Sequence, residues 1–218
     1  MKLLLSISLV LLLVGCQDSV VGPEATSQAA VADVHGPDVR YEVVLKPLNA
    51  RANKRGVTGK AAITVDEGMI TFAVDARNVA PGITHIQHVH AGNACPTMKD
   101  DANGDGFLDL IEGVPVYGGI FINLDSDLST QPAGAFPIAT DRGLLTYEED
   151  VAASDLVAGL KAAGVLADGE LVNLEGRHIV VHGVAPDTEL PATVKTLPGV
   201  PSQVTLPVAC GEIRVAKR

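Results

Sequence analysis

The sequence predicts an all-β domain, an antiparallel sandwich or barrel with long loops and one short helix. Short runs that favour strands recur along the chain, and turn-forming residues such as 66–68 and 81–82 separate them. In one run Ile70, Phe72 and Val74 alternate with polar neighbours, as in a strand with one buried face. The expected strands are residues 41–46, 59–65, 69–76, 83–90, 120–124, 178–184 and 209–215.

Residues 149–166 are the exception, because they are rich in alanine and leucine. We expect a short helix here, with Ser154 or Asp155 as its N-cap residue. The segment stands between expected strands and does not alternate with them, so an α/β fold is not predicted.

The first residues predict an exported bacterial lipoprotein. An apolar run at residues 3–14 is too short to span a bilayer but has the length of a signal-peptide core. It ends in Leu-Val-Gly-Cys at residues 13–16, which resembles a bacterial lipobox. We expect a signal peptide at residues 1–15, a lipidated Cys16 at the start of a flexible tether at residues 16–38, and one domain at residues 39–218.

The residue after Cys16 is Gln17, which favours the outer membrane or the cell surface over retention at the inner membrane. An ordinary cleaved signal peptide is the alternative, and it also leads to export. The formal net charge is −10 and basic runs are absent from the sequence, which argues against nucleic acid and anionic lipid as partners. Membrane contact is therefore expected through the lipid anchor only, and a protein partner or a homo-oligomer stays open.

Three of the six histidines lie within residues 85–90. In a strand His88 and His90 project to the same face, whereas His85 points to the opposite face. Two adjacent imidazoles make half of a transition-metal site. The alternative is a hydrogen-bonded surface pair. His178 and His35 are expected to be structural or exposed.

Two of the three cysteines remain once Cys16 is set aside as the lipidation site. In an oxidising compartment Cys95 and Cys210 are expected to form a disulfide. Because it closes a loop of about 115 residues, the chain-entropy model assigns it roughly 4 to 5 kcal/mol.

Two distant motifs resemble the copper/zinc superoxide dismutase superfamily. The first comprises Gly82, His85, His88, His90, Gly92 and Cys95, and the second is Gly-Arg-His-Ile-Val-Val-His at residues 176–182, with Ala-Cys-Gly following at residues 209–211. The resemblance covers residues 41–215 and implies a Greek-key β domain. It also implies His88, His90 and His182 as metal ligands, His85 as a structural histidine, and a Cys95–Cys210 disulfide.

The chain departs from that family in two respects. Histidine is absent from the sequence between Cys95 and Arg177, where the bridging histidine and further zinc ligands of the family belong. Pro207 stands where the family has an arginine that steers superoxide. We therefore expect a three-histidine copper or zinc site, with nitrogens about 4 Å apart, and weak or no dismutase activity. A copper-dependent superoxide dismutase is the enzymatic alternative.

A second resemblance is to the CHRD domain, carried by Gly-Glu-Ile-Arg at residues 211–214. It implies a non-catalytic interaction module with a similar β architecture. Nucleophile motifs, phosphate loops and nucleotide fingerprints are absent from the sequence.

Residues 101–112 match the calcium loop of an EF-hand. Proline at positions 96 and 115 leaves no room for full flanking helices, so we expect a lone structural site with a Kd of roughly 10⁻⁴ to 10⁻³ M. A solvated acidic turn is the alternative. The expected calcium ligands are Asp101, Asn103, Asp105, the Phe107 carbonyl, Asp109 and Glu112.

Overall fold

The computed structural model describes residues 38–53, 55–131 and 134–217. The predicted signal peptide, the lipidation site at Cys16, His35 and nearly all of the tether lie outside these residues. In the part of the chain that is described, no helix has the length and apolar character needed to cross a bilayer.

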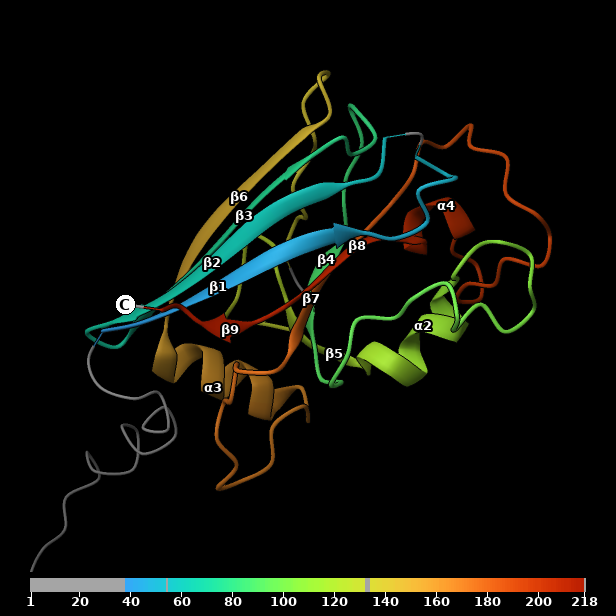
Figure 1. Ribbon diagram of the computed structural model, residues 1–218. Helices are drawn as coiled ribbons and strands as arrows, with labels where there is room; N and C mark the ends of the chain where they lie inside the picture. The colour runs from blue at the N-terminus through green and yellow to red at the C-terminus, as the bar shows by residue number, and fades with distance from the viewer. Residues whose placement is uncertain (1–37, 54, 132–133, 218) are drawn as a thin grey trace, which may run out of the picture.

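The described residues form one curved antiparallel sheet, which curls into a half-barrel (Figure 1). The strand order is β5-β4-β7-β8-β1-β2-β3-β6, and β9 pairs with β1. The predicted all-β antiparallel fold is therefore confirmed. The strands are β1 Asp38–Pro47, β2 Thr58–Asp66, β3 Met69–Arg77, β4 Gln87–His90, β5 Ile120–Asn123, β6 Leu144–Ala152, β7 His178–His182, β8 Pro207–Glu212 and β9 Arg214–Val215.

The connections from β3 to β4 and from β5 to β6 cross between distant positions in the sheet, so strands distant in sequence become neighbours, as in Greek-key folds. The alternation predicted for residues 69–76 is seen in β3, where Ile70, Phe72 and Val74 are buried. Equivalent faces of β1 and β2 complete the main core. Their opposite faces carry the polar residues.

Strands β4 and β7 are buried on both faces. Val89, Ile179 and Val181 join the main core. On the other face, Val180 and Cys210 join a smaller cluster with Leu48, Leu108 and Tyr117. This second layer exists because the loops after β4 and β7 fold back over the sheet, and it places the histidines of β4 and β7 in a buried environment.

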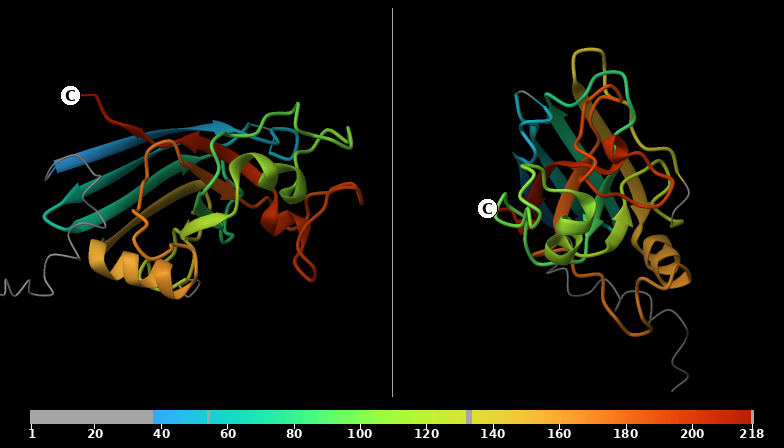
Figure 2. Two further views of the ribbon diagram at one scale, coloured as in Figure 1. Left: turned by 90° about the horizontal axis from the view of Figure 1, so that it is seen from below. Right: turned by 90° about the vertical axis from the view of Figure 1, so that its right-hand side faces the viewer.

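Three helices occur among the described residues: α2 Leu110–Tyr117, α3 Ala153–Ala162 and α4 Ser202–Thr205. Helix α3 confirms the expected helix and lies at the opposite end of the molecule from α2 and α4 (Figures 1 and 2). The predicted N-cap was wrong, because Ala152 occupies that position without a side-chain hydrogen bond. Residues 149–152 were expected to belong to the helical segment, but they form the end of β6 and pair with β3. Strand β6 then continues directly into α3.

Helix α2 was not predicted, because Pro115 was expected to interrupt it. Asp109 is its N-cap residue and forms a capping box with Glu112, which satisfies amide groups at the start of the helix. The buried Tyr117 ends the helix and anchors it on the sheet. Capping and packing thus offset the hydrogen bond that Pro115 cannot make.

Candidate metal centre

His88, His90 and His182 come together on the outer face of the paired strands β4 and β7. One ring nitrogen from each lies within 4.8 Å of the other two. Tetrahedral ligands about 2.1 Å from an ion lie roughly 3.4 Å apart, so the distances between these nitrogens need to shorten by at most about 1.4 Å. Among the residues that the structure describes, these three histidines form the one group of His, Cys, Asp or Glu side chains that lie close enough together to hold a metal ion.

Two of the rings are oriented by backbone carbonyls. His90 Nδ1 lies 2.9 Å from the carbonyl oxygen of Gly118, and His182 Nδ1 lies 2.8 Å from that of Thr205. Because a carbonyl can only accept, each Nδ1 donates its proton. In the neutral imidazoles Nε2 is therefore left with a free lone pair. Such outer partners are typical of metal-binding histidines.

Three buried nitrogens of this cluster have no hydrogen-bond partner: His88 Nδ1, His90 Nε2 and His182 Nε2. The side chains are 6%, 2% and 3% exposed, respectively. Leaving a buried polar atom unpaired costs about 1 to 3 kcal/mol. Each of the three rings thus keeps one buried, unpaired nitrogen, and the rings lie close enough to share an ion, so the donor set fits a metal.

The surroundings keep these imidazoles neutral. Burial, followed by the nearby His182 and His90, lowers the pKa of His88 well below its ordinary value. Burial lowers the pKa of His90 to about 4, against the opposing effect of the Gly118 carbonyl. Burial and then His90 lower the pKa of His182 to about 3. At neutral pH the lone pairs are therefore free for a ligand rather than occupied by protons.

His85 and His178 lie outside the cluster. His85 is buried between the carbonyl oxygens of Ala80 and His182, each 2.9 Å from one of its ring nitrogens. It therefore connects the segment before β4 to the backbone of a candidate ligand. His178 is also buried, and its Nδ1 lies 3.1 Å from the carbonyl oxygen of Gly92.

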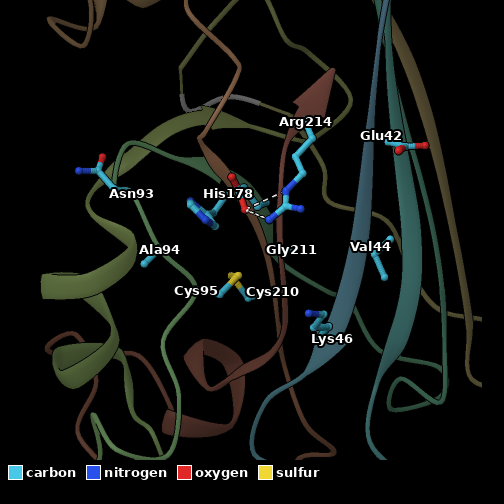
Figure 3. Close-up of a pocket in the computed structure, with 11 residues that line it drawn as sticks. Glu42, Val44, Lys46, Asn93, Ala94, Cys95, His178, Cys210, Gly211 and Arg214 are labelled. Carbon is cyan, nitrogen blue, oxygen red and sulfur yellow. Dashed lines mark hydrogen bonds and ion pairs between the residues drawn. A yellow bond between two sulfur atoms is a disulfide. The ribbon is translucent and has the colours of Figure 1, made fainter. Parts of the chain in front are cut away.

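Cys95 and Cys210 form the predicted disulfide, with Cα atoms 5.7 Å apart. The bond joins the loop after β4 to β8 and borders a groove that also includes His178 and Arg214 (Figure 3). Arg214 is paired with Glu212. The disulfide also contacts the small cluster that contains Tyr117, so it holds the layer that covers the histidines.

Tyr117 is a site residue that the sequence did not reveal. Its ring centre lies 4.5 Å from that of His90 and 6.3 Å from that of His182. Burial and then Asp109 raise the pKa of Tyr117, so its phenol stays neutral. The motif residue Gly92 allows this approach, because a Cβ there would lie 2.3 Å from the Tyr117 carbonyl carbon. No spacing signal links these two residues, which are 25 positions apart.

The three histidines line a cavity of about 450 Å³. None of the described residues around it is Lys, Arg, Asp or Glu. Asn123 and Thr205 are the remaining polar side chains in its wall. The apolar wall includes Leu110, Val114, Ile120, Phe136, Leu197 and Val200.

The predicted calcium ligands are not gathered in the same way. Among the described residues, the loop carboxylates form no group of three or more that could hold one metal ion, as the histidines do. Asp101 accepts hydrogen bonds from the backbone N–H groups of Gly104 and Gly106, each at 2.8 Å. Glu112 accepts from Ala102, Asn103 and Asp109. Asn103 accepts from Asp105, and the backbone of Phe107 donates to Asp105.

Asp105 and Asp109 also bind a second loop. Thr193 donates its hydroxyl to Asp105 at 2.6 Å, and the backbone N–H of Lys195 donates to Asp109 at 2.6 Å. The acidic loop therefore holds the segment that leads to Leu197 and Val200 in the cavity wall. Calcium binding stays a prediction.

No protein-family model matches this chain, and no curated protein matches it. The resemblance to the copper/zinc superoxide dismutase superfamily therefore stays a prediction from the two motifs and their order along the sequence.

Proposed function

We propose that this protein holds one transition-metal ion, copper or zinc, through His88, His90 and His182. Two observations carry this proposal: one ring nitrogen of each histidine lies within 4.8 Å of the other two, and each ring has a buried nitrogen without a hydrogen-bond partner. Neutral imidazole suits both metals, and three protein ligands leave one coordination position open. When bound, copper supplies one-electron chemistry and zinc supplies Lewis acidity.

The proposed setting is the cell envelope of a bacterium, with the β domain outside the cytoplasm on a lipid-anchored tether. The lipobox-like residues 13–16 support this placement. Replacement of Cys16 by serine should move the protein from the membrane fraction to the soluble one. Unchanged membrane association would refute the anchor.

We propose weak or no dismutase activity for this site. Superoxide is a small anion, and attraction into a cleft requires local positive charge. Pro207 stands in place of the family's arginine, and no Lys or Arg is among the described residues that line the cavity. A copper-dependent dismutase is the competing enzymatic function. A CHRD-like interaction module would need neither metal nor turnover.

The test is titration of the purified full chain with zinc and copper, followed by elemental analysis. We expect one ion per chain in the wild type and none in His88→Ala. His178→Ala is the matched control, because His178 is a buried histidine on β7 outside the cluster. No binding to the wild type, or equal binding to His88→Ala, would refute the metal site.

A superoxide assay on the copper-loaded protein separates the enzymatic alternatives. A rate no higher for the wild type than for His88→Ala rules out dismutation at this site. A much faster wild type would establish the dismutase and refute our proposal of weak or no activity.

We also propose a structural calcium ion in residues 101–112. The support is the sequence pattern, together with positive φ angles at Gly104 and Gly106 that permit the tight turn. Because Asp105 and Asp109 bind the segment at Thr193 and Lys195, order in this loop would extend to the wall of the cavity.

A further inference from the structure

The cavity beside the three histidines has a mainly apolar wall. Side chains from α2, β5 and the segment after residue 196 make it apolar, as described above. Its volume of about 450 Å³ lies in the range of small-molecule sites, roughly 300 to 1,000 Å³. Leu197 at its rim is 52% exposed, which leaves an apolar side chain at the entrance.

The polar groups of the cavity are concentrated at the histidines. His90 and His182 are more than nine-tenths buried, line the cavity and each have an unpaired Nε2. His88 contributes its unpaired Nδ1. A small number of polar groups in an otherwise apolar cavity is the usual arrangement for orienting a small ligand.

Charge selects among the molecules that could enter. In the metal-free cavity a small inorganic ion would lose its hydration and find no opposite charge among the described lining residues. With an ion held by the histidines, an anion would be attracted by that ion alone, and the apolar wall would add nothing to its binding. A neutral molecule with an apolar body would instead gain by covering the wall. The apolar wall therefore favours a ligand with a neutral, apolar body.

We propose that this cavity binds a neutral, mainly apolar small molecule that presents one nitrogen, oxygen or sulfur donor to the ion held by the three histidines. The donor contact rests on the proposed metal site. The contact with the wall does not, because the apolar lining is present without an ion. These two parts can be tested separately.

The first experiment uses the metal-free full chain and the neutral fluorophore N-phenyl-1-naphthylamine. We expect saturable binding, weakened at least about tenfold in Leu197→Asp because a carboxylate at the rim disfavours the apolar probe. Leu144→Asp is the matched control, since Leu144 is 47% exposed and outside the cavity wall. It should bind within about twofold of the wild type. Absent binding, or equal loss in both variants, would overturn the cavity.

The second experiment uses the zinc-loaded chain and compares 4-phenylimidazole, imidazole and azide by calorimetry. We expect 4-phenylimidazole to bind at least about tenfold more tightly than imidazole, because the phenyl group covers the wall. Leu197→Asp should reduce this preference, whereas Leu144→Asp, outside the cavity wall, should leave both the preference and the zinc affinity unchanged. Equal affinity for the two azoles, or tighter binding of azide, would overturn the proposed ligand class.

Failure of the metal site is distinguishable from failure of the cavity. Zinc titration alone reports on the histidines, and the fluorophore alone reports on the wall. If zinc does not bind while the fluorophore does, the donor contact is refuted and the apolar site stands. If zinc binds and the wild type shows no preference for an apolar body, the metal site stands and the cavity proposal is refuted.

Discussion

Acidification of the metal-free protein should destabilise it in a pH range set by the buried histidines. The pKa of His90 is about 4 and that of His182 about 3 in the folded protein, against an ordinary value near 6.5. As the pH falls below about 6.5, the unfolded chain takes up protons that the folded chain does not. The stabilisation is therefore complete above about pH 6.5 and is lost progressively as the pH falls through about 4 for His90 and about 3 for His182.

The size of the effect follows from the two shifts. At pH 5 each of these histidines is almost fully protonated in the unfolded state and mostly neutral in the folded state. Linkage then gives about 2 kcal/mol for each, or about 4 kcal/mol together between pH 8 and pH 5. His88 changes stability in the same direction. For a domain of this size the fall corresponds to roughly 10 °C in Tm.

Urea unfolding in the presence of a chelator, at half-unit steps from pH 8 to pH 5, measures this change. This range lies above the ordinary pKa of carboxyl groups, so it isolates the histidines. His182→Asn keeps a side-chain N–H for the Thr205 carbonyl but does not titrate, and it should reduce the loss by about 2 kcal/mol. Stability that is flat or rises between pH 8 and pH 5 would refute the burial of neutral histidines.

Three further predictions concern the ligands and the disulfide. Zinc at about 100 times its Kd should stabilise the protein by about 2.7 kcal/mol at pH 7.5, as measured by urea unfolding; an equal gain in His90→Ala would contradict the site. Replacement of both Cys95 and Cys210 by serine should cost about 2 to 5 kcal/mol and weaken zinc binding, because the covering layer loosens. Unchanged zinc affinity in that variant would show that the disulfide does not support the site. Calcium removal should lower Tm in the wild type but not in the Asp101→Ala, Glu112→Gln variant, and identical melting curves with and without a chelator would count against the loop.

Several features of the structure could be predicted from short sequence patterns alone. Alternation predicted β3, and strand parity placed His88 and His90 on one face. Cysteine counting predicted the disulfide. These inferences succeed because each depends on a short periodicity or on a small number of possible pairings. The strand at residues 144–152 was missed because its last residues favour a helix, and pairing with β3 overrode that preference.

The candidate metal centre could be described only from the sequence and the tertiary structure together. From the sequence, the order of its motifs pointed to His88, His90 and His182. His178 shares a strand face with His182, and only its distance of four residues along the strand set it apart. Only the tertiary structure decided that the three rings are buried together, that Gly118 and Thr205 orient two of them, and that Tyr117 and an apolar cavity adjoin them. The physical reason is that Gly118, Thr205, Tyr117 and much of the cavity wall belong to the segments that connect the strands. The positions of these segments follow from long-range packing, which produces no periodic pattern in the sequence.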